Sequence, residues 1–105
     1  MSAQNADFAA QLARAWAYHR QGNNASAITE FEAILASSKD NVDALYGLGL
    51  AQRSNGRTDK ALEAFRRADQ LIAVGLQEKP NEDRYEMLER MIKQRLAEIE
   101  GTPIR

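Results

Sequence analysis

Residues 45–68 read LYGLGLAQRSNGRTDKALEAFRRA, and this stretch carries two helical patterns on either side of one glycine. In its second half, Ala61, Phe65 and Ala68 recur three or four residues apart, as do residues on one face of an α-helix. Gly56 separates the two patterns, and glycine readily adopts the left-handed backbone conformation that ends a helix. The stretch therefore predicts a helix, a tight turn and a second helix.

The same pattern occurs once before, 34 residues earlier in the chain. When residues 8–41 are laid on residues 42–75, a glycine, an aromatic residue and small residues coincide: Gly22 with Gly56, Phe31 with Phe65, Ala10 with Ala44, Ala17 with Ala51 and Ala27 with Ala61. A period of this length is typical of helical arrays, in which neighbouring units bury a shared core. We expect the phenylalanines to fill the space between neighbouring helices, and Asn24 and Thr58 to cap the second helix of each unit.

This repeat resembles the tetratricopeptide repeat family, whose units are helix pairs of 34 residues. The second unit has residues of the family pattern at Leu45, Leu48, Gly49, Gly56, Ala61, Phe65 and Ala68. Gln52 stands where the family has an aromatic residue. The first unit agrees at Ala15, Tyr18, Gly22, Ala27 and Phe31 but differs at Gln11, Arg14 and Ile34. The resemblance covers residues 8–75 and implies a stack of helix pairs.

The last third of the chain departs from this period, because Pro80 delays the next helix. We expect the helix that begins near Thr58 to run to about Gln77 before Pro80 stops it. The final helix is expected over residues 81–100, with Asn81 as its cap, and its apolar residues form one stripe: Tyr85, Leu88, Ile92, Leu96 and Ile99. A stack of repeats exposes apolar surface at its ends, so a helix of this kind suits a capping role.

The sequence thus predicts an all-α fold, a short right-handed superhelix (α-solenoid) of two helix-turn-helix units and a terminal capping helix. The 105 residues are the length of one ordinary domain, which we expect over residues 7–100. The remaining segments are an expected flexible N-terminus at residues 1–6 and a C-terminal tail at residues 101–105.

Composition argues against catalysis and against binding of nucleic acid or membranes. Fourteen basic and fifteen acidic residues give a net charge of −1, which provides no general attraction to nucleic acid or anionic lipid. No apolar run approaches the roughly 20 residues of a spanning helix, and the N-terminus lacks a signal-peptide pattern, so we expect a cytoplasmic protein. With no cysteine and one histidine, the chain offers no catalytic triad, phosphate-binding motif or metal-ligand spacing. We therefore expect no enzymatic activity, no metal and no other cofactor.

The resemblance also implies a binding surface, because members of the family usually bind ligands in a concave groove lined by the first helix of each unit. The corresponding positions are Leu12, Trp16 and His19 in the first unit, Asp43, Tyr46, Leu50 and Arg53 in the second, and Glu86, Arg90 and Lys93 in the last helix. The apolar members of this set predict a protein or peptide partner with apolar anchors.

The sequence leaves the placement of Trp16 open between the groove and the core, since an aromatic residue at helical spacing suits both. Tyr46 and Leu50 are expected to be exposed in the groove, because Leu45, Leu48 and Gly49 already occupy the core-facing positions of that helix.

Self-assembly is the alternative function. Two repeats are fewer than the three or more that usually make such an array stable. A homodimer that buries Leu12 and Trp16, or Met87 and Met91, would complete the core.

Overall fold

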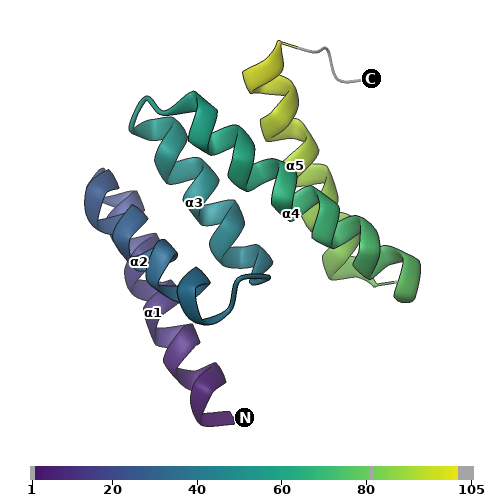
Figure 1. Cartoon of the computed structure of the whole chain (residues 1–105), viewed down its shortest axis with the longest axis horizontal. Helices are drawn as coiled ribbons and strands as arrows, with labels where there is room; N and C mark the ends of the chain where they lie inside the picture. The colour runs from purple at the N-terminus through teal and green to yellow at the C-terminus, as the bar shows by residue number, and fades with distance from the viewer. Residues whose placement is uncertain (1, 81, 102–105) are drawn as a thin grey trace.

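The computed structural model describes the backbone of residues 2–80 and 82–101 and the side chains of residues 8–80 and 82–101. In this part of the chain there are five α-helices and no strand, so the prediction of an all-α helical-repeat solenoid is confirmed. The helices are α1 (Ser2–Arg20), α2 (Asn24–Ser37), α3 (Val42–Ser54), α4 (Thr58–Glu78) and α5 (Asp83–Glu100). Figure 1 shows α3 between α2 and α4, with α1 behind α2 and α5 behind α4.

The turns inside the two units contain glycine in the left-handed conformation. Gly22 and Gly56 each have φ of 79°, which side chains with a Cβ rarely adopt. The predicted caps, however, are one residue too late, because Asn24 and Thr58 already lie within α2 and α4. The N-cap of α2 is Asn23, whose side chain accepts a hydrogen bond from the backbone N–H of Ser26.

The ends of the chain differ from prediction at one point. Helix α1 begins at Ser2, so residues 2–6, expected as a flexible N-terminus, belong to the helix. The segment contains neither glycine nor proline, and no residue there opposes helix formation. Asn81, the expected cap of α5, and residues 102–105 of the expected tail lie outside the described residues.

Helix α3 lies in the centre of the molecule because its glycines admit phenylalanine rings from both neighbours. The fully buried Phe31 of α2 packs on Gly47, and the fully buried Phe65 of α4 packs on Gly49. A Cβ at either glycine would lie less than 3.0 Å from the ring. The prediction that these phenylalanines fill the space between neighbouring helices is confirmed.

Helix α5 covers the end of the stack with its apolar stripe. Leu88 and Ile92 are buried in one cluster with Ile72 of α4, and the other members of the predicted stripe pack against this cluster. Met91, one of the two methionines named above as residues that a homodimer could bury, is partly buried and packs against the same cluster. The other methionine, Met87, is 49% exposed. Among the described residues, no helix combines the length and the apolar character needed to cross a membrane.

Candidate functional site

A chain of aromatic rings joins the two repeat units. The Trp16 ring of α1 meets the ring of Phe31 edge-on, with centroids 5.2 Å apart, and lies 6.3 Å from the ring of Tyr46 in α3. Tyr46 in turn lies 5.8 Å from Phe65. Trp16 is partly buried and packs against both core clusters. The sequence left open whether Trp16 lies in the groove or in the core. In the structure it packs against the core and keeps part of its surface exposed.

The expected exposure of Tyr46 is wrong, because its side chain is only 7% exposed. Neighbouring helices cover it, with Trp16 on one side and Phe65 on the other. Leu50, one turn further along α3, is partly buried and packs against the same core cluster as Tyr46. Tyr46 thus lies buried beneath the predicted binding surface, whereas Leu50 is partly exposed on that surface.

The N-terminal part of the predicted surface also holds Leu12 and His19. Leu12 is partly buried against the first core cluster. The His19 ring lies edge-on to Trp16 at 5.9 Å between centroids. Its Nδ1 atom is buried, and no hydrogen-bond partner for it exists among the described residues. Trp16 is therefore flanked on α1 by one apolar and one polar side chain.

Charged residues predicted for the surface connect α3 to α5. Arg84 of α5 donates to Asp43 at 2.5 Å, and Arg53 of α3 donates to Glu98 of α5 at 2.6 Å. Lys93 lies 3.6 Å from Asp69 of α4. The Arg84–Asp43 and Arg53–Glu98 ion pairs thus link α3 to α5 through long side chains, and the Lys93 contact links α5 to α4.

The Arg53 contact also changes the acidity of its partner. The hydrogen bond from Arg53 is the largest cause that holds the pKa of the Glu98 carboxyl below 4.5, and Arg95 contributes a second hydrogen bond. Arg53 is therefore already engaged within the chain, and a partner would have to compete with Glu98 for it.

The remaining predicted residues, Glu86 and Arg90, are exposed on α5. Neither forms an ion pair with a residue that the structure describes. They are thus the charged members of the predicted set that form no ion pair within the described ranges. In those same ranges, no group of three His, Cys, Asp or Glu side chains is placed to hold a metal ion.

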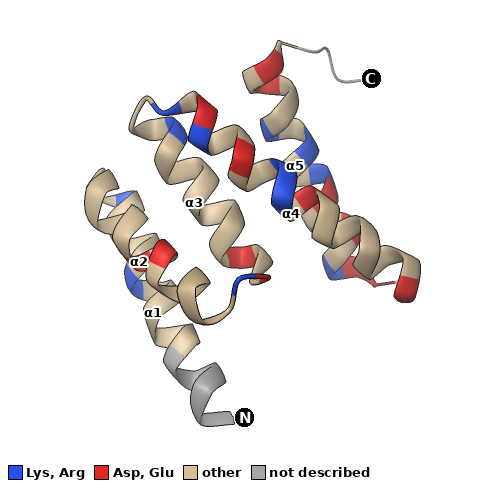
Figure 2. Ribbon diagram, in the orientation of Figure 1, with Lys and Arg blue, Asp and Glu red and all other residues tan. Residues whose placement is uncertain are grey.

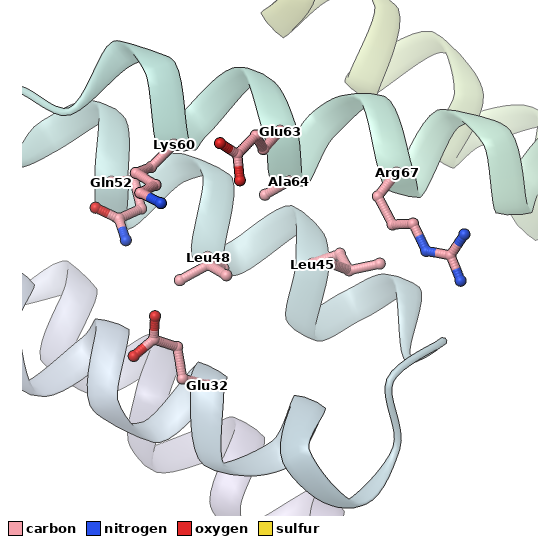
Figure 3. Close-up of a pocket in the computed structure, with 8 residues that line it drawn as sticks. All are labelled: Glu32, Leu45, Leu48, Gln52, Lys60, Glu63, Ala64 and Arg67. Carbon is pink, nitrogen blue, oxygen red and sulfur yellow. The ribbon is translucent and has the colours of Figure 1, made fainter.

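A pocket that the sequence analysis missed lies between α2 and α4, with α3 as its floor (Figure 3). Its volume is about 320 Å³, and its lining residues are Glu32, Leu45, Leu48, Gln52, Lys60, Glu63, Ala64 and Arg67. We call it the α3 pocket. One signal for it was visible in the sequence, since Gln52 replaces the aromatic residue of the repeat pattern.

These features define a helical-repeat scaffold in which the first helices contact one another in succession, α1 with α3 and α3 with α5. The family model described as tetratricopeptide repeat matches residues 5–74, and the chain belongs to this family. Proteins of the family generally mediate protein–protein interactions and are typically not catalytic. No curated protein and no solved structure gave a significant match to the chain.

Proposed function

We propose that α1, α3 and α5 form a non-enzymatic surface that binds a segment of another protein. The observation that carries this proposal is Trp16, which touches both repeat units and remains partly exposed beside Leu12. A large aromatic ring that is held rigidly by its neighbours loses little entropy when it binds a partner. Partly exposed Leu50 extends the apolar surface onto α3.

The chemistry of this surface favours a partner with apolar anchors and flanking charges. Leu12, Trp16 and Leu50 would contact the anchors, and affinity in such interfaces depends on a few side chains of this kind. Exposed Glu86 and Arg90 would meet opposite charges at the edge, where they affect association rate more than affinity. Asp43, Arg53, Lys93 and His19 complete the proposed surface, and Tyr46 supports it from within.

The chain contains a reporter for this proposal, since Trp16 is its single tryptophan. We would select peptides against the immobilised full chain from a random library and measure their binding by tryptophan fluorescence. Binding at the proposed surface should change the emission of Trp16, and Leu50→Ala should weaken the affinity about tenfold, as loss of an anchor does.

A matched control is Val74→Ala, because Val74 is an apolar residue of α4 that is 53% exposed. It should leave peptide affinity unchanged. Peptides that bind equally well to the Leu50→Ala chain, without changing the Trp16 emission, would refute the proposed surface. Light scattering over a hundredfold concentration range would identify a second copy of the chain as the occupant if the mass doubles from 11.7 kDa.

A further inference from the structure

The contacts of α5 show which of its sides adjoins α3. Arg84 of α5 donates to Asp43 of α3 at 2.5 Å. Glu98, near the other end of α5, accepts from Arg53 of α3 at 2.6 Å. The side of α5 that adjoins α3 is therefore the one that carries Arg84 and Glu98.

Two methionines lie on this side of α5, between the two contacts. Met91 is seven residues from Arg84 and seven from Glu98. Seven residues make about two turns of a helix, so these three residues lie nearly in line. Met87 lies one turn before Met91, close to the same line. We call Met87 and Met91 the methionine strip.

The charged residues predicted for α5 lie on another line of this helix. Glu86 and Lys93 are also seven residues apart, with Arg90 between them. Lys93 contacts Asp69 of α4 at 3.6 Å. Because Glu86 and Arg90 each precede a methionine of the strip by one residue, they are turned about 100° away from it. A partner that lies along α3 therefore meets the methionine strip first, with Glu86 and Arg90 at the edge.

The methionine strip is accessible and adds to the apolar residues of the other first helices. Met87 is 49% exposed, and Met91 is partly buried against the core cluster that contains Tyr46. Trp16 of α1 and Leu50 of α3 are partly buried against the same cluster. Each of α1, α3 and α5 thus supplies an apolar side chain that covers this cluster and keeps part of its own surface exposed.

The charged side chains on the line of the strip are already paired within the part of the chain that the structure describes. Arg84 is hydrogen-bonded to Asp43, and Glu98 accepts from both Arg53 and Arg95. A charged group of a partner would have to compete with these contacts. An apolar group meets exposed thioether and aliphatic surface, so the strip favours an uncharged apolar side chain.

We propose that the methionine strip binds an aromatic side chain of the partner protein. This inference rests on the proposed function, and it names the apolar anchor that reaches α5. A thioether sulfur is polarisable and makes favourable contacts with aromatic rings. The unbranched methionine side chain also adapts its shape to a flat ring. Trp16 and Leu50 would hold the neighbouring anchors of the same partner.

The experiment uses the full chain labelled with ¹³C at its methionine methyl groups. The chain has three methionines, and the single variants Met87→Leu and Met91→Leu assign the two resonances of the strip. The probe is a blocked tripeptide, acetyl-Ala-Phe-Ala-amide. Its matched probe carries cyclohexylalanine, a side chain of similar size and apolar character without an aromatic ring.

We expect the phenylalanine peptide to shift both methionine resonances and to bind with a Kd on the order of 1 mM. The cyclohexylalanine peptide should bind about twofold to tenfold more weakly, because it lacks the contact between sulfur and an aromatic ring. Both constants come from the same titration, followed by the methionine resonances.

Variants assign this preference to the strip. Met87→Leu combined with Met91→Leu keeps the apolar surface and removes both sulfur atoms, so it should bind the two peptides equally. Met87→Glu places a charge on the strip and should weaken binding of the phenylalanine peptide at least tenfold, as followed by Trp16 emission. Its matched control is Val74→Glu, at an apolar residue of α4 that is 53% exposed. The control chain should bind normally, and circular dichroism should show equal helix content in both.

Equal affinity of the unsubstituted chain for the two peptides would overturn the proposal, as would full binding in the Met87→Glu chain. Methionine resonances that shift when the chain alone is diluted would also overturn it, because a second copy would then occupy the strip. Library peptides that require Leu50 but bind the Met87→Glu chain normally would refute the strip and leave the first surface standing. Failure of one proposal is therefore distinguishable from failure of the other.

Discussion

The N-terminal and C-terminal halves of the molecule are joined by different interactions. Helices α1, α2 and α3 meet through aromatic rings, with Trp16 between Phe31 and Tyr46. Helices α4 and α5 meet through the aliphatic residues Ile72, Leu88 and Ile92, which form one core cluster with Phe65 and Tyr46. These two helices carry most of the charge, as Figure 2 shows. There, ion pairs such as Arg66–Glu100 surround the cluster.

This difference predicts how stability is distributed. Buried rings exclude water and leave cavities when removed, so each contributes several kcal/mol. Exposed ion pairs contribute little, because water and salt screen them. The solenoid should therefore depend strongly on its buried aromatic rings, including Phe65 of α4, which packs against Tyr46 where the two halves meet, and weakly on any single exposed charge.

The largest effect should come from Phe65→Ala. The ring is fully buried against Gly49 and Tyr46, so its loss should cost about 3–5 kcal/mol. Urea unfolding followed by circular dichroism measures this change, and the melting temperature should fall by about 15 °C or more. Phe31→Ala should fall in the same range. A loss below about 1 kcal/mol at either site would show that the rings do not hold the units together.

A smaller loss is expected from Gly49→Ala. Alanine favours a helix over glycine by about 1 kcal/mol, but the new methyl group would overlap the Phe65 ring, and overpacking costs about 1–3 kcal/mol. We expect net destabilisation in urea unfolding. The double variant Gly49→Ala, Phe65→Leu should lose less than the sum of its single changes. If Gly49→Ala instead stabilises the chain, the ring has room to move.

The parts of this architecture that were predictable from sequence are those set by local pattern. The glycine turns and the spacing of Phe31 and Phe65 predicted the helices and their packing, because these features depend on residues within one unit and its neighbour. The start of α1 was missed because nothing in residues 2–6 marks a helix boundary. The caps were misplaced by one residue, an error that local propensity alone does not correct.

The surface was harder to predict, because exposure depends on residues distant in the sequence. Tyr46 has the spacing of a groove residue, yet Trp16 and Phe65 cover it from α1 and α4. Asp43 and Arg53 likewise find partners on α5. The α3 pocket arises where three helices meet, and Gln52 was its one local sign.

Ion pairs in the C-terminal half should prove weak individually. Arg84→Gln removes the partner of Asp43, and both side chains are substantially exposed. We expect a loss of about 0.2–1 kcal/mol in urea unfolding at low salt. The loss should shrink in 1 M NaCl, where the screening length is about 3 Å. A loss above about 2 kcal/mol that persists at high salt would mean that the α3–α5 contact is as important as the aromatic one.

The smallest effect concerns the acidity of Glu98. Its pKa lies below 4.5, chiefly because Arg53 donates a hydrogen bond to the carboxylate. A folded-state pKa that is lowered gives a stabilisation that is present above pH 4.5 and is lost as the pH falls through the lowered value. Arg53→Gln should therefore raise the Glu98 pKa toward 4.5 in a carboxyl NMR titration. The urea midpoints of the two chains should also converge in acid.

Arg95→Gln should raise the Glu98 pKa less, because Arg95 contributes the weaker hydrogen bond. An unchanged Glu98 pKa in the Arg53→Gln chain would show that this ion pair does not form in solution, and the charged half would then rest on its aliphatic contacts alone.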